Sequence, residues 1–287
     1  MAEKTLTYDA VIIGFGKGAK TLAARLGKQG KHVALIEKSN MMYGGTCINV
    51  GCIPSKSLYT SAINSLSVAL VSFEQKKKLY YDAIDEKIRV TKMLREKNYA
   101  KLASNKNIEI IDGEASFVEP HLVQVNCAKK TIYVSAPWIF INTGSTAVVP
   151  KIEGLENNSY VFYSESIMNL KELPKKLTII GGGYIGLEFA SMYANFGSDV
   201  TVIQDGEKFI PREDDDVSAC IENILVEQKI KIIKGVNVVS VSKNGEVAYK
   251  TSDGKINDVQ SDAVLVATGR VPNVKALHVE KAGIELT

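Results

Sequence analysis

The sequence predicts an α/β fold made of two similar halves, because one short pattern occurs twice along its 287 residues. In each copy an apolar strand leads into a glycine-rich turn, a helix and a second apolar strand. The turns read GFGKGA at residues 14–19 and GGGYIG at residues 181–186. The residue that closes the second strand, Glu37 or Gln204, lies 23 positions after the first glycine in both copies. This spacing is typical of the βαβ unit that binds dinucleotides, so we predict two Rossmann-like domains.

The first unit comprises a strand at residues 8–13, the turn, a helix to about residue 29 and a strand at residues 32–36. In such a turn Gly14 permits the tight bend, Gly16 lets a pyrophosphate reach backbone N–H groups, and the small Ala19 lets helix and strand pack closely. The helix N-terminus adds partial positive charge. Glu37 stands where a carboxylate accepts hydrogen bonds from a ribose 2′-hydroxyl, which favours an unphosphorylated adenosine ribose, as in FAD or NAD.

Two cysteines five positions apart, Cys47 and Cys52, follow in the stretch GGTCINVGCIPSK. A regular helix would separate them by about 7.5 Å along its axis, so a disulfide between them requires an irregular segment. Gly51 offers backbone freedom, and Pro54 suits a first helical turn, which places Cys52 near a helix N-terminus that stabilises a thiolate. A staple closing so short a loop would stabilise little, and the three histidines lie far away in sequence. Reversible redox chemistry is therefore favoured over a staple, and no metal site is expected.

Between the two units the sequence predicts a largely helical stretch at residues 54–104 and short strands near residues 108–111, 122–125, 131–134 and 138–141. The segment around Pro150 and Ile152 is typical of a linker. We therefore predict a first domain at residues 1–150, a second at residues 151–272, and the start of a return to the first domain at residues 273–287.

The second unit repeats the pattern with strands at residues 177–180 and 199–203. Its three small turn positions are Gly181, Gly183 and Gly186. Gln204 takes the place of the acidic residue, and a neutral amide does not repel a ribose 2′-phosphate. Because the cations Lys208 and Arg212 follow, the sequence slightly favours NADPH without excluding NADH.

The composition is that of a soluble globular protein, with 45% hydrophobic residues, 23% charged residues and a net charge of +3. The lysines are scattered and lack interleaved aromatic residues, so we expect no nucleic-acid partner. We see no secretory segment and no membrane span in the sequence. Four cysteines in a chain of this length do not form a disulfide scaffold, which favours a cytoplasmic protein.

Two dinucleotide units with CxxxxC after the first resemble the class I pyridine nucleotide-disulfide oxidoreductases, and GGTCINVGCIPSK resembles their active-site signature. The resemblance runs from Tyr8 to the end of the chain and includes INTGS at residues 141–145 and ATGRVPN at residues 267–273. GFGKGAKTLA, MYGGTCINVGCIPSK and GGGYIGLEFASMYANFGS are most similar to the bacterial reactive-chlorine-resistance flavoproteins, the hypothiocyanous acid reductases. Mercuric reductases and dihydrolipoamide dehydrogenases are more distant. The resemblance implies two domains of three-layer ββα type, one for FAD and one for NAD(P)H.

The resemblance also implies a relay in which NADPH or NADH reduces FAD, and the flavin passes two electrons to a Cys47–Cys52 disulfide. Cys52 matches the thiol next to the flavin, and Cys47 matches the thiol that meets a small oxidant, with hypothiocyanous acid favoured and a disulfide or Hg(II) as alternatives. Lys56 matches a lysine near flavin N5, Glu188 its ion-pair partner, and Tyr184 the residue that gates the nicotinamide pocket. Further matches are Lys38, Gly45, Thr46, Gly113, Ala115, Thr143 and Gly144 for FAD, and Ile185, Gly269 and Arg270 for the nicotinamide nucleotide.

Members of this family continue beyond the position of Thr287 with a third flavin segment and a dimerisation domain that carries a catalytic His–Glu pair. The resemblance therefore implies homodimers for full-length relatives. We expect this chain to lack the acid–base histidine, part of the FAD site and the dimer interface. One hypothesis is an NAD(P)H-dependent flavoprotein disulfide reductase, or its electron-input part. The other is a nucleotide-binding fragment without turnover, in which the cysteine pair is inert.

Overall fold

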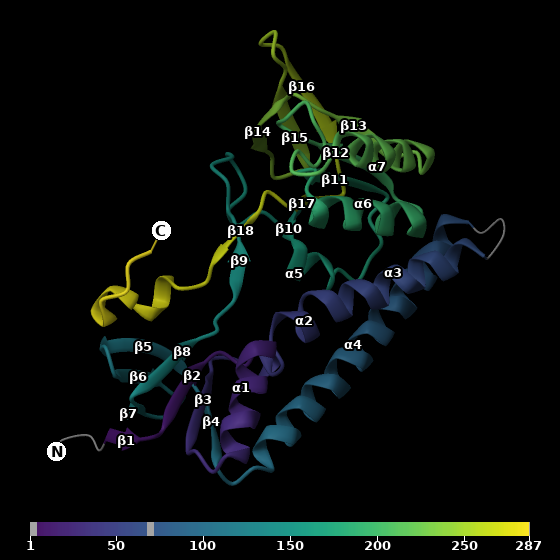
Figure 1. Ribbon diagram of the computed structural model, residues 1–287. Coiled ribbons are helices and arrows are strands. Elements are labelled where there is room, and N and C mark those ends of the chain that lie inside the picture. Colours follow the sequence, from purple (N-terminus) through teal and green to yellow (C-terminus); the bar gives the residue numbers. More distant parts are fainter. Residues whose placement is uncertain (1–4, 68–71, 287) are drawn as a thin grey trace. The chain divides into compact units, whose positions relative to one another are not determined.

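The chain forms two compact units in a computed structural model that describes residues 5–67 and 72–286 (Figure 1). The first unit contains Met1–Pro54, Ile88–Thr146 and Pro272–Thr287, and the second contains Ser55–Lys87 and Ala147–Val271. The chain passes between the units at residues 146–147 and again at residues 271–272, both within a few residues of the boundaries expected from the sequence. Residues 55–87, in contrast, belong to the second unit and not to the first, where the sequence analysis had placed them. At these two positions, the strands β9 (Ser145–Ala147) and β18 (Arg270–Pro272) form a two-stranded sheet.

A parallel sheet with strand order β4-β3-β2-β8 forms the centre of the first unit. Its strands are β2 (Ala10–Ile13), β3 (Val33–Glu37), β4 (Ile108–Asp112) and β8 (Trp138–Ile141). Every residue of β2 and β3 is buried, as expected for parallel strands covered on both faces. Alternate residues serve opposite faces: Ile12 joins a core with Ala19 of α1 (Lys17–Lys28), whereas its neighbour Val11 joins a core with Phe117 of a second sheet.

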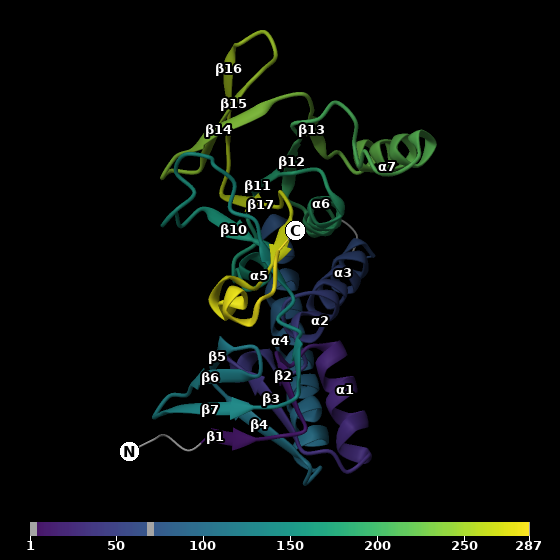
Figure 2. The ribbon, with the colours of Figure 1, turned by 60° about the vertical axis from the view of Figure 1, so that its left-hand side comes forward.

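The second sheet of this unit has the order β1-β7-β6-β5 and lies on the face opposite α1 (Figure 2). It contains β1 (Thr5–Thr7), β5 (Glu114–Glu119), β6 (Leu122–Asn126) and β7 (Thr131–Ser135). The short helices η2 (Lys275–Leu277) and η3 (Val279–Ala282) add Leu277 and Val279 to the same core. The predicted three-layer ββα arrangement is confirmed for this unit. The sequence analysis missed β5, because only Gly113 separates it from β4.

The second unit repeats this layering around a parallel sheet of order β10-β17-β11-β12-β13. Its strands are β10 (Val161–Tyr163), β11 (Lys176–Ile180), β12 (Asp199–Ile203), β13 (Lys231–Ile233) and β17 (Ala263–Val266). Ile179 packs in one core with α6 (Tyr184–Phe196) and α7 (Asp215–Glu227). Ile180 packs on the other face, in a core with Val247 of the antiparallel sheet β14 (Asn237–Val241), β15 (Glu246–Lys250) and β16 (Ile256–Gln260). Both Rossmann-like domains are therefore present.

The helices α3 (Cys52–Leu66) and α4 (Phe73–Ala103) explain why residues 55–87 belong to the second unit. Leu58 and Tyr80 are fully buried in the core that α6 forms with the parallel sheet. The Tyr80 hydroxyl donates to the carbonyl of Leu170 over 2.9 Å and lies 3.0 Å from the hydroxyl of Tyr193. Charged side chains occur throughout α4, and within residues 5–67 and 72–286 no helix is long and apolar enough to cross a membrane.

Lys87, on α4, is a buried lysine and gives a testable pH dependence. Only 3% of the residue is exposed, its ammonium donates to the Asn169 side chain over 2.8 Å, and burial lowers its pKa to about 8. Between that value and the ordinary lysine pKa, the unfolded chain binds the proton that the folded chain has released. The free energy of unfolding should therefore rise by roughly 3 kcal/mol as the pH increases from about 8 to 10.5.

Urea unfolding at several pH values measures this rise. Lys87→Met should lose it, because the apolar side chain has no proton to release, whereas Lys92→Met, a change at an exposed lysine of the same helix, should keep it. If Lys87→Met and the wild type follow parallel curves, Lys87 is not the group responsible.

Candidate active site

The first glycine turn and the cysteine segment line one pocket in the first unit. Eleven of the residues expected to bind or react with FAD lie on its wall: Gly14, Gly16, Glu37, Lys38, Gly45, Thr46, Cys47, Gly113, Ala115, Thr143 and Gly144. Gly14 has a φ of +100°, and a Cβ there would lie 2.4 Å from the carbonyl oxygen of Asn142. A Cβ at Gly16 would lie 2.6 Å from the Asn142 side chain. There is no space for a side chain at Gly14 or Gly16, and its absence lets a pyrophosphate approach the backbone closely.

Ala19, the remaining residue expected around this turn, is buried in the contact between α1 and the sheet and does not line the pocket. Its small side chain serves helix packing, as expected for the third position of the turn. Phe15, Lys17 and Asn142 also line the pocket, although the sequence analysis did not assign them to it. Phe15 and Lys17 stand inside the glycine motif and could have been found from it. Asn142 directly follows β8 and could be placed only once the neighbouring strands were known.

Glu37 is buried at the end of β3 and fixes the glycine turn. One carboxylate oxygen accepts the N–H of Phe15 over 3.0 Å, and the other accepts the N–H of Ser39 over 3.1 Å. Phe15, the middle residue of the turn, is thus hydrogen-bonded to the last residue of β3, the strand that follows α1. This geometry keeps the carboxylate on the pocket wall, where a ribose hydroxyl could donate to its remaining lone pairs.

The chain between the two cysteines is irregular, as a bond between them requires. The short helix α2 (Thr46–Asn49) ends before Val50, whose φ of −142° is not helical, and α3 begins at Cys52. Gly51 was expected to provide backbone freedom, but its φ is not in the left-handed region. The reason for glycine is space, because a Cβ there would lie 3.0 Å from the carbonyl oxygen of Thr46.

Cys47 and Cys52 are not joined by a disulfide in this structure. Cys47 is half-buried and Cys52 is exposed at the N-terminus of α3. A hydrogen bond with Cys52 raises the pKa of Cys47, and burial raises it further, while the positive charges of Lys17 and Lys20 act in the opposite direction. The two sulfur atoms are therefore close enough to interact in the dithiol state.

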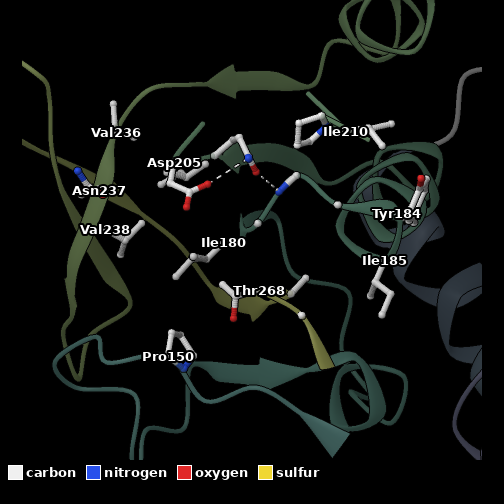
Figure 3. A pocket seen from close by; sticks show the side chains of 18 of the residues that line it. Pro150, Ile180, Tyr184, Ile185, Asp205, Ile210, Val236, Asn237, Val238 and Thr268 are labelled. Atoms are coloured by element: carbon white, nitrogen blue, oxygen red, sulfur yellow. Dashed lines mark hydrogen bonds between the residues drawn. The ribbon is translucent and has the colours of Figure 1, made fainter. Parts of the chain in front are cut away.

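A second pocket, in the second unit, surrounds the other glycine turn (Figure 3). Seven of the residues expected to bind the nicotinamide nucleotide line it: Gly181, Gly183, Tyr184, Ile185, Gln204, Gly269 and Arg270. The Gln204 side-chain oxygen accepts the N–H of Gly182 over 2.7 Å. Since Gly182 is the middle residue of its turn, Gln204 holds this turn as Glu37 holds the first. Gly186 packs beneath the turn, where a Cβ would lie 2.0 Å from the carbonyl oxygen of Gly181.

Lys208 does not lie where the sequence analysis expected it. Its ammonium is 2.5 Å from the Asp215 carboxylate and 3.0 Å from the Glu213 carbonyl oxygen, and it is not part of the pocket wall. The wall contains Arg212 and, beside Gln204, the carboxylate of Asp205, which accepts the Gln204 amide over 3.1 Å (Figure 3). One of the two expected cations, Arg212, is thus present, but it shares the wall with an acidic group, which removes part of the argument for NADPH.

Several expected residues of the second unit form side-chain contacts. The ammonium of Lys56 is 2.6 Å from the carboxylate of Glu188, so the ion pair that the family resemblance implies is present, with Lys56 largely exposed. The phenol of Tyr184 donates to the carboxylate of Glu213, and this bond raises the Tyr184 pKa. Arg270 lies 3.3 Å from Glu165, which follows β10 in the short helix α5 (Ser164–Ile167).

Comparison with known proteins identifies what this arrangement resembles. Residues 8–287 match the family described as Pyridine nucleotide-disulphide oxidoreductase. The chain is 45% identical over 277 residues to the probable pyridine nucleotide-disulfide oxidoreductase RclA of Escherichia coli K12, an alignment that covers 96% of this chain and 60% of that protein. It is 37% identical over 286 residues to a mercuric reductase of Lysinibacillus sphaericus, covering 97% and 51% of the two chains.

A solved structure is similar throughout the described fold. The Cu(II) complex of the HOCl-induced flavoprotein disulfide reductase RclA from Escherichia coli matches with a TM-score of 0.89 and 44% identity. The match covers 98% of this chain and 60% of that one. The chain therefore spans about 60% or less of the length of these relatives.

Proposed function

The chain belongs to the pyridine nucleotide-disulphide oxidoreductase family, and from this premise we propose that it is the electron-input part of an NAD(P)H-dependent flavoprotein reductase. The observation that carries the proposal is that Cys47 lines the same pocket as Gly14, Gly16 and Glu37. A thiol therefore lies on the wall of the pocket in which the glycine turn would hold FAD. When bound, FAD would supply transfer of two electrons from NAD(P)H to the cysteine pair.

The residues of the chain have separate tasks in this proposal. The turn at Gly14 and Gly16 and the carboxylate of Glu37 bind and orient FAD, and the turn at Gly181 and Gly183 binds the nicotinamide nucleotide. Lys56, held by Glu188, and Tyr184 take the roles that the family resemblance implies for them. Following the family resemblance, Cys47 reacts with the oxidant and Cys52 resolves the product; Cys47 lies on the pocket wall and Cys52 at the start of α3.

We propose a small electrophilic oxidant as the substrate, with hypothiocyanous acid favoured. The Cys47 thiolate attacks the sulfur of HO–SCN, so that a Cys47–S–SCN bond forms, the S–O bond breaks, and the oxygen leaves as hydroxide and is protonated to water. The Cys52 thiolate then attacks the Cys47 sulfur, which forms the disulfide and releases thiocyanate with its electron pair. Two electrons from NAD(P)H restore the dithiol. Support comes from the similarity to RclA, which is described as HOCl-induced.

The proposal is tested by stopped-flow oxidation of NAD(P)H by the FAD-loaded chain with four oxidants in parallel. Hypothiocyanous acid should be reduced fastest, ahead of oxidised glutathione, oxidised lipoamide and Hg(II). The similarity to a mercuric reductase makes Hg(II) the alternative to exclude. A colourless protein that does not retain FAD would contradict the proposal altogether, whereas faster reduction of Hg(II) would change only the substrate.

Asp205 predicts how the chain discriminates between the two nicotinamide nucleotides. Its exposed carboxylate lies on the pocket wall next to Gln204, where a ribose 2′-phosphate would meet like charge. Asp205→Asn should improve the affinity for NADPH relative to NADH by about tenfold, since a like charge at contact distance costs on the order of 1 kcal/mol or more. Titration of both nucleotides measures the ratio. Asp258→Asn, at an exposed position on β16, should leave the ratio unchanged, and an equal ratio in all three proteins would exclude Asp205 as a determinant.

A further inference from the structure

Two lysines of α1 lie beside the thiol that would meet the oxidant. Lys17 is the first residue of α1 and lines the same pocket as Cys47. Lys20 follows three positions later, so that both side chains project from one side of the helix. The cysteine segment packs directly against the start of this helix, because a Cβ at Gly45 would lie 2.5 Å from the Cα of Gly16. The helix start and the reactive segment are thus in backbone contact.

The ammonium of Lys20 is held in place from a third element. It donates to the side-chain oxygen of Asn98 over 2.5 Å, and the Asn98 amide in turn donates to the Leu94 carbonyl over 2.6 Å, one turn earlier in α4. Lys20 is half-buried, so its position is more restricted than that of an exposed lysine. These hydrogen bonds, from the Leu94 carbonyl through Asn98 to Lys20, hold the ammonium in place, and nucleotide binding does not explain them.

The electrostatic effects on the two partners agree. Burial lowers the pKa of Lys20, and the negative charge of the Cys47 thiolate raises it. For Cys47, the groups that act on the sulfur are the Cys52 thiol, which raises the pKa together with burial, and the ammonium groups of Lys17 and Lys20, which lower it. Two positive charges thus favour the thiolate at a position where burial and a neighbouring thiol disfavour it.

We propose that Lys17 and Lys20 form a cationic site at Cys47, which stabilises the thiolate and selects small oxidants that are anionic or release an anion when attacked. This inference rests on the proposed function and specifies its substrate class. Lys20, positioned by Asn98, is the ordered member of the site. Lys17 is the exposed member, on the pocket wall.

The chemistry of the cysteine pair gives such a site a task in each step. When the Cys47 thiolate attacks atom X of an oxidant X–Y, an S–X bond forms, the X–Y bond breaks, and Y departs with the electron pair as an anion. When the Cys52 thiolate attacks the Cys47 sulfur, the disulfide forms and X departs as a second anion. The NAD(P)H of the proposed function supplies the two electrons that restore the dithiol. Positive charge close to the sulfur lowers the cost of both departures.

Alkylation by two reagents of different charge tests the site without any turnover. The dithiol form of the full chain is treated with iodoacetate, an anion, or with iodoacetamide, which is neutral, and the rate at Cys47 is read by tandem mass spectrometry. The ratio of the two rates reports the local potential and cancels differences in exposure. We expect Lys17→Gln and Lys20→Gln each to lower this ratio about fivefold, in keeping with an interaction on the order of 1 kcal/mol, and high salt to lower it in the wild type.

Three controls make the result specific. Lys129→Gln, a change in an exposed lysine of the same unit, should leave the ratio at Cys47 unchanged. Lys20→Arg should restore it, because the charge is kept. The rate at Cys127, which is partly buried against the core of the same unit, should be equal in all variants if the fold is intact. Equal ratios at Cys47 in the wild type and both glutamine variants would overturn the proposal.

The outcome also separates this inference from the proposed function. If the chain does not oxidise NAD(P)H but shows the expected ratios, the cationic site is supported and the proposed function is contradicted. If the chain oxidises NAD(P)H but the ratios are equal in all variants, the proposed function is supported and the cationic site is contradicted.

Discussion

Replacing Cys52 by serine should abolish the long-wavelength absorption of the FAD-loaded chain after two-electron reduction, and should lower turnover at least about a thousandfold. The family resemblance implies that the Cys52 thiolate lies next to the flavin, and we expect this absorption to come from their contact. A serine hydroxyl neither ionises at neutral pH nor forms a disulfide, so both the absorption and the resolving step are lost.

Two further serine variants distinguish this role from a general loss of stability. Cys47→Ser should abolish reduction of the oxidant but keep the absorption band, since Cys52 remains. Cys127→Ser, a change of the same size in the first unit and away from the pocket, should alter neither. Counting thiols gives a readout without turnover, because oxidation of the wild type should consume two of its four thiols, and oxidation of either active-site variant should not form the Cys47–Cys52 disulfide. A band that persists in Cys52→Ser would contradict the assignment.

The two dinucleotide units could be predicted from sequence because their signals are local. The strand predicted at residues 199–203 coincides with β12, and the strand predicted at residues 177–180 differs from β11 by one residue. Glycines at fixed spacing restrict the turn, and continuous apolar runs mark strands that are buried on both faces. The positions of Glu37 and Gln204 follow from the same spacing, whereas their matching bonds to Phe15 and Gly182 required coordinates.

The features that sequence could not provide depend on residues distant in the chain. Residues 55–87 join the second unit because Tyr80 packs against Tyr193, more than 100 positions away. Lys208 was expected in the nucleotide pocket because of its charge, but Asp215 and the Glu213 carbonyl hold it elsewhere. Such competition between possible partners is decided by tertiary packing, and no periodicity in the sequence reports it.

Replacing Gly186 by alanine should lower the free energy of unfolding by about 3 kcal/mol, at the upper end of the effect of overpacking. The added methyl would lie 2.0 Å from the carbonyl oxygen of Gly181 and 3.3 Å from the side chain of Ile179. Since the first obstacle is backbone, the side chains cannot relieve the contact, and α6 must move away from β11. Urea unfolding monitored by circular dichroism measures the loss. Binding of NAD(P)H should weaken as well, because the movement displaces the turn.

Gly183→Ala separates the packing requirement from the binding requirement within the same turn. Gly183 is exposed, has a φ of −81°, and has no atom within 4 Å of the position of an added Cβ. The free energy of unfolding should therefore change by less than about 1 kcal/mol, a cost limited to the loss of a favourable residue at the helix start. The methyl would nevertheless stand where a pyrophosphate must approach the backbone, so the affinity for NAD(P)H should fall at least about tenfold. If Gly183→Ala bound the nucleotide with unchanged affinity, the cofactor would not lie over this turn, and the second pocket would need another ligand.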